Sequence, residues 1–269
     1  MTYPRKPESC VRIILLGDVV GRPGRAALKE FLMPLKSQSE ADLVIANGEN
    51  AAGGAGIDPG TAREIKSSGV DVITLGDHAF QRKGSAELLN DNPSWCIRPA
   101  NLPADSTPGR GECNVTLADG TKVRIINLLG RVFISGTMEC PFRAISSWLD
   151  RHAQAGAAIT VCDFHAEATS EKYAMARHVD GKISLLVGTH THVQTSDVQV
   201  LPGGTGYITD LGMTGNPHGV IGMKSEVALQ RFLSPMPAPY QVAEGAGELR
   251  GIIADIDRAS GRTTGICLV

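Results

Sequence analysis

The feature that most constrains this chain is a recurring pattern: a short apolar run, then glycine, then residues with metal-binding side chains. Three such runs precede residue 80 and lead into Asp18, into Asn47-Gly48-Glu49-Asn50 and into Gly76-Asp77-His78. Short apolar runs are typical of buried strands, and the segments between these runs have the apolar spacing of helices. The pattern therefore predicts an α/β fold in which parallel strand ends open on one cleft.

The remaining elements are predicted from the same periodicities and from turn residues. An Asp-Gly pair at 119–120 predicts a hairpin, and residues 240–269 carry alternating apolar runs that predict antiparallel strands. Strands are predicted, in chain order, over residues 11–16, 42–46, 70–75, 112–117, 122–128, 157–161, 183–187 and 205–208. Helices are predicted over residues 24–38, 58–68, 141–155 and 170–178.

Composition limits what such a fold can bind. A net charge of −2 gives no basis for a stable nucleic-acid partner or for binding to an anionic membrane. No apolar run reaches the length of about 20 residues that spans a bilayer, and the first residues are polar. The six cysteines are scattered without a Cys-x-x-Cys pair, so neither a zinc ribbon nor a disulfide framework is expected. We expect a cytoplasmic protein with a single domain over residues 1–269.

Two of the seven histidines lie one residue apart in Gly188-Thr189-His190-Thr191-His192, directly after an apolar run. Alone, this pair fits two hydrogen-bonded structural histidines almost as well as two metal ligands. In an extended segment, side chains two positions apart face the same side. On that basis we expect both imidazoles to face the cleft and to reach different metal ions.

The predicted strand ends together supply more ligands than one tetrahedral ion can take, and enough for two. A mixture of imidazole and carboxylate suits Zn, Mn or Fe, whereas Ca and Mg call for oxygen ligands. A pair of metal ions suits the hydrolysis of phosphoesters. The residues that carry this prediction are Asp18, Glu49, Asp77, His78, His165, His190 and His192.

In order and type, these motifs resemble the calcineurin-like metallophosphoesterase superfamily and, more narrowly, its YmdB-like branch. The resemblance implies a four-layer α/β/β/α sandwich and a dinuclear phosphodiesterase acting on small nucleotides, including 2′,3′-cyclic nucleotides. The stretches that carry the narrower resemblance are Leu16-Gly17-Asp18-Val19-Val20-Gly21-Arg22-Pro23-Gly24, Asn47-Gly48-Glu49-Asn50-Ala51-Ala52, Asp163-Phe164-His165-Ala166-Glu167-Ala168-Thr169-Ser170-Glu171-Lys172 and Asp210-Leu211-Gly212-Met213-Thr214-Gly215.

The resemblance also implies roles for individual residues. It implies two divalent or mixed-valence ions, with Fe or Mn favoured and Zn acceptable, and a metal-bridging hydroxide that attacks phosphorus in line. The implied roles are Asp18 and His192 on one ion, Glu49 as the bridge, Asp77, His165 and His190 on the other ion, His78 as the general acid or phosphate contact, and Asn50 as an additional metal or phosphate contact.

The chain departs from the superfamily pattern in two places. The first motif of the superfamily is Asp-x-His, but Val20 holds the third place here, as in the YmdB-like branch. The expected Gly-Asn-His is Gly76-Asp77-His78 in this chain. An ionised Asp77 would cancel the net positive charge that Asn would leave for an anionic phosphate. Either one ion is trivalent, or Asp77 is protonated, or phosphate affinity is reduced.

Three functions stay open at this stage. The first is the phosphodiesterase, whose partner would be a small nucleotide substrate. The second is a regulatory nucleotide- or metal-binding protein of the same fold with weak turnover, an alternative that the Asp77 departure supports. The third is a protein phosphatase of the same superfamily. The sequence is compatible with a homo-oligomer, and it leaves the role of Glu167 open between orienting His165 and a surface ion pair.

Overall fold

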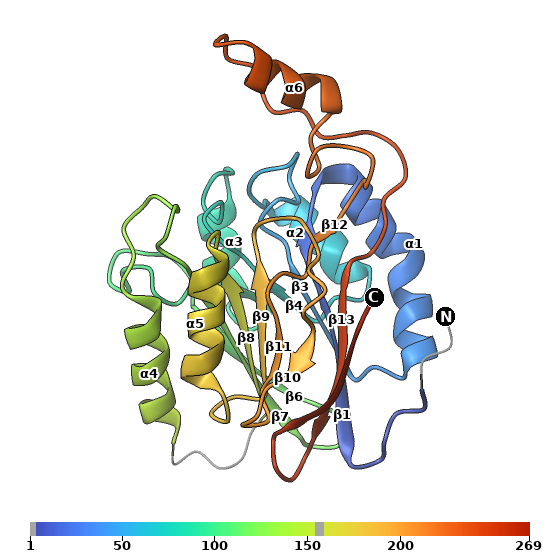
Figure 1. The fold of residues 1–269 in the computed structure, drawn as a ribbon, viewed down its shortest axis with the longest axis vertical. Helices are drawn as coiled ribbons and strands as arrows, with labels where there is room; N and C mark the ends of the chain where they lie inside the picture. The colour runs from blue at the N-terminus through green and yellow to red at the C-terminus, as the bar shows by residue number, and fades with distance from the viewer. Residues whose placement is uncertain (1–3, 154–158) are drawn as a thin grey trace.

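The computed structural model describes residues 4–153 and 159–269, and two six-stranded sheets form its centre (Figure 1). The first sheet contains, in spatial order, β14 (Thr263–Leu268), β13 (Gly251–Asp257), β1 (Cys10–Leu16), β3 (Leu43–Asn47), β4 (Val72–Thr74) and β5 (Cys96–Ile97). The second contains β10 (Gln199–Val200), β11 (Gly206–Ile208), β9 (Leu185–Thr189), β8 (Ile159–His165), β7 (Lys122–Leu129) and β6 (Glu112–Thr116). A small third sheet pairs β2 (Asp18–Val19) with β12 (Met213–Thr214).

The inner strands of both large sheets are parallel. Strands β1, β3, β4 and β5 pair in parallel in the first sheet, and β7, β8, β9 and β11 do so in the second. Antiparallel pairing is confined to the flanking β13, β14, β6 and β10. Parallel pairing brings the carboxyl ends of neighbouring strands to a common edge of each sheet. The register places Thr189 beside His165 at the ends of β9 and β8.

Three apolar clusters hold these sheets and their helices together. Alternation along β1 turns Ile13 and Leu15 toward the second sheet, where they share a cluster with Val161. Ile14 lies on the opposite face, in a cluster with Leu28 of α1. Figure 1 shows α1 on one side of the strands and α4 and α5 on the other. The helices are α1 (Gly21–Ser39), α2 (Pro59–Ser67), α3 (Ser85–Asp91), α4 (Pro141–His152), α5 (Thr169–Val179) and α6 (Ser225–Leu233).

The predicted α/β class and the predicted hairpin of β6 and β7 are confirmed. The end of the helix predicted over 141–155 and the start of the strand predicted over 157–161 lie outside the described residues. The prediction of strands from residue 240 is wrong up to Gly251, because only isolated bridges at Val242 and Glu248 precede β13. No helix in the described part of the chain is both long and apolar enough to cross a membrane.

Two helices were not predicted, α3 and α6. Helix α6 stands apart from the strands at the top of Figure 1. It buries only Ala228, while Phe232 and Leu233 are more than four-fifths exposed. Helix α6 therefore contributes almost nothing to the apolar core.

Candidate metal centre

Four ligand side chains meet where β3, β4, β8 and β9 end. The donor atoms of Glu49, Asp77, His165 and His190 all lie within 4.8 Å of one another, and we call these residues the four-residue cluster. The His165 Nε2 atom lies 3.1 Å from Asp77 Oδ1 and 3.3 Å from Glu49 Oε1. His190 Nδ1 lies 2.9 Å from the same His165 nitrogen. The convergence of two carboxylates and two imidazoles on one point is a donor set that fits a transition-metal ion.

Gly76 is part of the reason that the cluster is so tight. A Cβ atom at this position would lie 2.2 Å from Glu49 Oε2 and 2.3 Å from His165 Cδ2. Both distances are shorter than any non-bonded contact, so a side chain here would displace two of the four ligands. Only glycine lets β4 deliver Asp77 to the cluster.

The second group of predicted ligands lies beside the cluster. Asp18 Oδ2 accepts a hydrogen bond from the backbone N–H of His190 at 3.1 Å. Its Oδ1 atom is buried without a hydrogen-bond partner, 3.8 Å from His165 Nδ1 and 4.0 Å from His192 Nε2. Burial raises the pKa of the Asp18 carboxyl despite these imidazoles. A buried carboxylate oxygen without a donor is the feature that a bound cation would satisfy, so these residues fit the implied metal.

The ring orientation of each histidine is set by a partner on its far nitrogen. His192 Nδ1 donates to the carbonyl of Ile221 at 2.8 Å, so the lone pair for a metal ion is on Nε2, which here accepts from Asn50 Nδ2 at 3.0 Å. His165 Nδ1 lies 2.9 Å from the Thr189 hydroxyl, which in turn donates to Asp163 at 2.7 Å. Because the Thr189 hydroxyl donates its hydrogen bond to Asp163, the Thr189 oxygen accepts from His165 Nδ1. The His165 Nε2 atom therefore remains available as a metal ligand.

Glu167 orients His190 and not His165. Its Oε2 atom lies 3.2 Å from His190 Nε2, which leaves Nδ1 directed into the cluster. This contact of the exposed Glu167 has features of both roles left open by the sequence, an ion pair near the surface and the orientation of a histidine, but the histidine is His190.

The sequence predicted an extended segment at His190 and His192, but the structure shows that this segment is not extended. Strand β9 ends at Thr189, and both histidines have positive φ angles, 103° and 65°. Such angles are rare for residues with a Cβ atom and occur where surrounding contacts enforce them. Here the buried Asp210 carboxylate accepts from the Thr191 N–H at 3.1 Å and from Lys172 Nζ at 2.7 Å. The expectation that both histidines follow strand alternation is therefore wrong.

His78 and Asn50 join the two groups of ligands. His78 Nδ1 donates to Asn50 Oδ1 at 2.9 Å, and Asn50 Nδ2 donates to Glu49 Oε1 at 3.1 Å and to His192 Nε2 at 3.0 Å. Hydrogen bonding to Glu49 raises the pKa of His78, which favours its protonated form. His78 lines the cleft outside the four-residue cluster, so it is available to a substrate.

Asp77 is ionised in this environment. Burial acts to raise its pKa, but hydrogen bonds with His165 and His190 outweigh burial and lower the pKa well below its usual range. Of the three ways to reconcile Asp77 with an anionic substrate, a protonated Asp77 is therefore the least compatible with its surroundings.

The cleft above these ligands has a volume of about 370 Å³. One wall carries predicted site residues, and the other comes from the segment around α6, which the sequence did not indicate as functional. The lining residues are Glu49, Asn50, Gly54, His78, Glu167, His190, Thr191, His192, Ile221, Met223, Arg231 and Tyr240.

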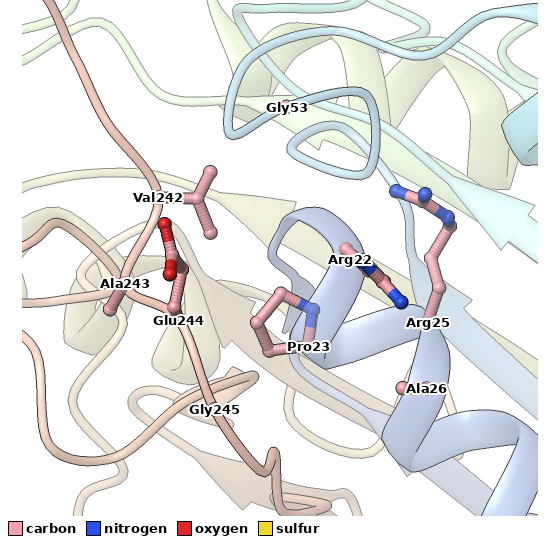
Figure 2. Close-up of a pocket in the computed structure, with 9 residues that line it drawn as sticks. All are labelled: Arg22, Pro23, Arg25, Ala26, Gly53, Val242, Ala243, Glu244 and Gly245. Atoms are coloured by element: carbon pink, nitrogen blue, oxygen red, sulfur yellow. The ribbon is translucent and has the colours of Figure 1, made fainter.

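A larger cavity of about 730 Å³ lies beside the start of α1. Figure 2 shows Arg22 and Arg25 on the helix facing the Val242–Gly245 segment, with Gly53 above them. None of the predicted metal ligands lines this larger cavity. Arg25 is paired with Glu64, and Glu244 is paired with Lys224. The candidate site is therefore the smaller cleft.

Two parallel-stranded sheets with histidines and carboxylates at their strand ends define a metallophosphoesterase-type fold and site. The chain belongs to the YmdB-like family, whose profile, described as YmdB-like protein, matches residues 14–269. It is 43% identical over 247 residues to the 2′,3′-cyclic-nucleotide 2′-phosphodiesterase of Bacillus subtilis, covering 92% of each chain.

Two solved structures extend this comparison. The structure of a novel phosphatase from Mycoplasma pneumoniae has a TM-score of 0.90 at 33% identity, with 97% of this chain and 92% of that chain covered. A hypothetical protein from Thermus thermophilus has a TM-score of 0.89 at 38% identity, with 96% and 98% covered. Both confirm the fold over nearly the whole chain.

Proposed function

We propose that this protein is a metal-dependent phosphodiesterase that hydrolyses small nucleotide phosphodiesters such as 2′,3′-cyclic nucleotides. The observation that carries the proposal is the four-residue cluster beside the unpartnered Asp18 oxygen. The cleft of about 370 Å³ is of a size for one small ligand. The likeness to the Bacillus subtilis phosphodiesterase supports the same substrate class.

The proposed metal ligands follow the two groups of side chains. Asp18 and His192 would hold one ion, Asp77, His165 and His190 the other, and Glu49 would bridge them. Imidazole–carboxylate sets accept Fe, Mn and Zn, and we favour Fe or Mn. When bound, the ions would supply a hydroxide nucleophile near neutral pH and offset the charge of the phosphate.

The chain's own residues would contribute proton transfer and orientation. The raised pKa of His78 keeps a proton on an imidazole that lines the cleft, where it can be given to the leaving oxygen. Asn50 fixes this ring through Nδ1, so Nε2 is the atom that would donate. Because its amide also contacts Glu49 and His192, Asn50 could turn toward a metal ion or a phosphate oxygen.

A regulatory nucleotide- or metal-binding protein with weak turnover is the second candidate function. The ionised Asp77 favours it, because the added negative charge weakens attraction for an anionic phosphate. In that case the fold and the metal ligands would serve binding, and hydrolysis would be slow.

Turnover assays with added Mn²⁺ test these candidates. We expect hydrolysis of bis-p-nitrophenyl phosphate and of 2′,3′-cyclic AMP, and little release of phosphate from a phosphoserine peptide. Nucleotide binding without turnover of either diester would support the regulatory protein. Faster turnover of the phosphopeptide than of cyclic AMP would support a protein phosphatase. Elemental analysis of protein purified without chelator would identify the bound metal.

A further inference from the structure

The cleft has a second wall that carries no predicted ligand. Ile221, Met223, Arg231 and Tyr240 line it, and all four come from the segment that includes α6, which contacts His192 through the carbonyl of Ile221. This wall combines an aromatic ring, two apolar side chains and a guanidinium group. The metal wall, in contrast, carries carboxylates and imidazoles.

The Tyr240 hydroxyl is buried without a hydrogen-bond partner. Among the described residues, only one other buried side-chain oxygen or nitrogen lacks a partner, and that is Asp18 Oδ1 in the same centre. A buried hydroxyl without a partner lowers stability, so its presence in a native structure calls for an explanation. Burial raises the pKa of Tyr240, so the hydroxyl keeps its proton and can donate it in a hydrogen bond.

The Tyr240 ring packs closely against Gly54, and its hydroxyl lies near Gly222. A Cβ atom at Gly54 would lie 2.1 Å from Tyr240 Cε1, and one at Gly222 would lie 3.4 Å from the hydroxyl oxygen. The ring therefore packs directly against the Gly54 backbone. Tyr240 lines the cleft, and because its ring is packed in this way, little side-chain freedom remains to be lost when a ligand binds.

Arg231 is the only lysine or arginine among the residues that line this cleft. Its Nε and Nη2 atoms donate to the carbonyl of Ala238 at 3.0 and 2.8 Å, which anchors the guanidinium. The other N–H groups of Arg231 can donate to a ligand. It lies near enough to Tyr240 to lower the pKa of the phenol against the effect of burial. A planar guanidinium stacks on nucleobases and also donates hydrogen bonds.

We propose that Tyr240 and Arg231 recognise the nucleoside half of the substrate, an inference that rests on the proposed function. With the phosphate at the metal wall, the sugar and base extend toward the opposite wall. The Tyr240 hydroxyl donates to an acceptor of the nucleoside, and the Arg231 guanidinium lies on the face of the base beside Ile221 and Met223. Both are specificity-determining residues and take no part in proton transfer.

The test compares a nucleotide with a diester that has no nucleoside. Tyr240→Phe and Arg231→Ala are assayed with Mn²⁺ on 2′,3′-cyclic AMP and on methyl p-nitrophenyl phosphate. We expect Tyr240→Phe to raise KM for the nucleotide roughly 5-fold and Arg231→Ala about 10-fold, within the range of single polar contacts, with little change in kcat. The KM of the small diester stays unchanged. Arg143→Ala, at an exposed position of α4, is the matched control.

Binding separates this inference from the proposed function. Calorimetric titration of the Mn-loaded protein with 3′-AMP should show matching losses of affinity in both variants. Wild-type protein that binds 3′-AMP, weakened in the variants, but does not hydrolyse 2′,3′-cyclic AMP would refute the proposed function and support the recognition pair. Three results would overturn the assignment of Tyr240 and Arg231 to nucleoside recognition. They are unchanged KM and Kd in both variants, equal changes in KM on both diesters, and no binding of 3′-AMP by the wild type.

Folding of the variants is checked by thermal unfolding. Tyr240→Phe removes only a hydroxyl that has no partner, so its Tm should equal or exceed that of the wild type. A lower Tm would mean that the hydroxyl has a structural partner, which would overturn its assignment to the ligand.

Discussion

The two halves of the metal centre are built in different ways. In the four-residue cluster, the donor atoms already lie within 4.8 Å of one another. In the other half, Asp18 Oδ1 lies 4.0 Å from His192 Nε2, and this oxygen has no hydrogen bond. The first half is assembled by the packing of strand ends, whereas the second is incomplete until a cation satisfies that oxygen. Under the proposed arrangement of two ions, one ion would enter a formed site and the other would complete its site.

Removing one histidine from each half tests most directly whether the two halves bind metal separately. His190→Ala and His192→Ala alter residues of the same loop, so each is the control for the other. We expect each to lose about one equivalent of metal, and diester kcat/KM to fall more than ~100-fold, beyond the effect of losing a residue that only orients a ligand. Metal content by mass spectrometry after gel filtration checks this. Full loss of both ions in both variants would show that the halves are not separate.

His78 lies between the halves, and its removal separates proton transfer from metal binding. We expect His78→Ala to keep its metal and to lower kcat for 2′,3′-cyclic AMP about 100-fold, the lower range for loss of a general acid. Turnover of bis-p-nitrophenyl phosphate should change little, because p-nitrophenolate leaves without a proton. An equal loss on both substrates would assign His78 to phosphate contact, and no loss on either would remove it from the reaction.

Thr189 offers a way to loosen the assembled half without touching a ligand. Thr189→Val removes the hydroxyl that links His165 Nδ1 to Asp163. We expect metal affinity at the cluster to fall about 10-fold, measured by competition with a chelator, while the Asp18 side keeps its affinity. Thr116→Val, at an exposed position of β6, is the control. Equal weakening at both sites would mean that the halves share their support.

The smallest expected effect concerns the charge of the cluster. Asp77→Asn keeps an oxygen ligand and removes one negative charge, so we expect metal to stay bound and diester kcat/KM to rise by roughly 2- to 5-fold. Asp77→Ala, which removes the ligand, is the contrast and should lose metal. If Asp77→Asn is unchanged or slower with full metal content, the argument from charge is wrong.

The sequence predicted the strand-end ligands because their order and type depend on local patterns. An apolar run followed by glycine and a ligand residue is visible without knowledge of the fold, and Asp18, Glu49 and Asp77 follow from it. The roles assigned to individual ligands on each ion stay predictions. The positive φ angles at His190 and His192 could not be foreseen, because they depend on Asp210, which contacts this loop from a distant position and is itself held by Lys172.

The second wall of the cleft escaped prediction for a different reason. Arg231 lies on a helix that buries only Ala228, and Tyr240 follows it in a segment without regular structure. Neither has a periodic neighbour or a motif. Their relevance depends on Gly54 and on the ligands across the cleft, contacts that exist only once the chain has folded.

The absence of a side chain at Gly76 has a genetic consequence. Every single-base change of a glycine codon that alters the amino acid gives a residue with a Cβ atom, or a stop. At Gly76 that atom would overlap Glu49 and His165. Therefore no single-base change that replaces Gly76 can occur without disturbing the centre. Asp77, one codon later, can change to asparagine by one base. Single mutations can therefore adjust the charge of the centre, but they cannot replace Gly76 without changing its shape.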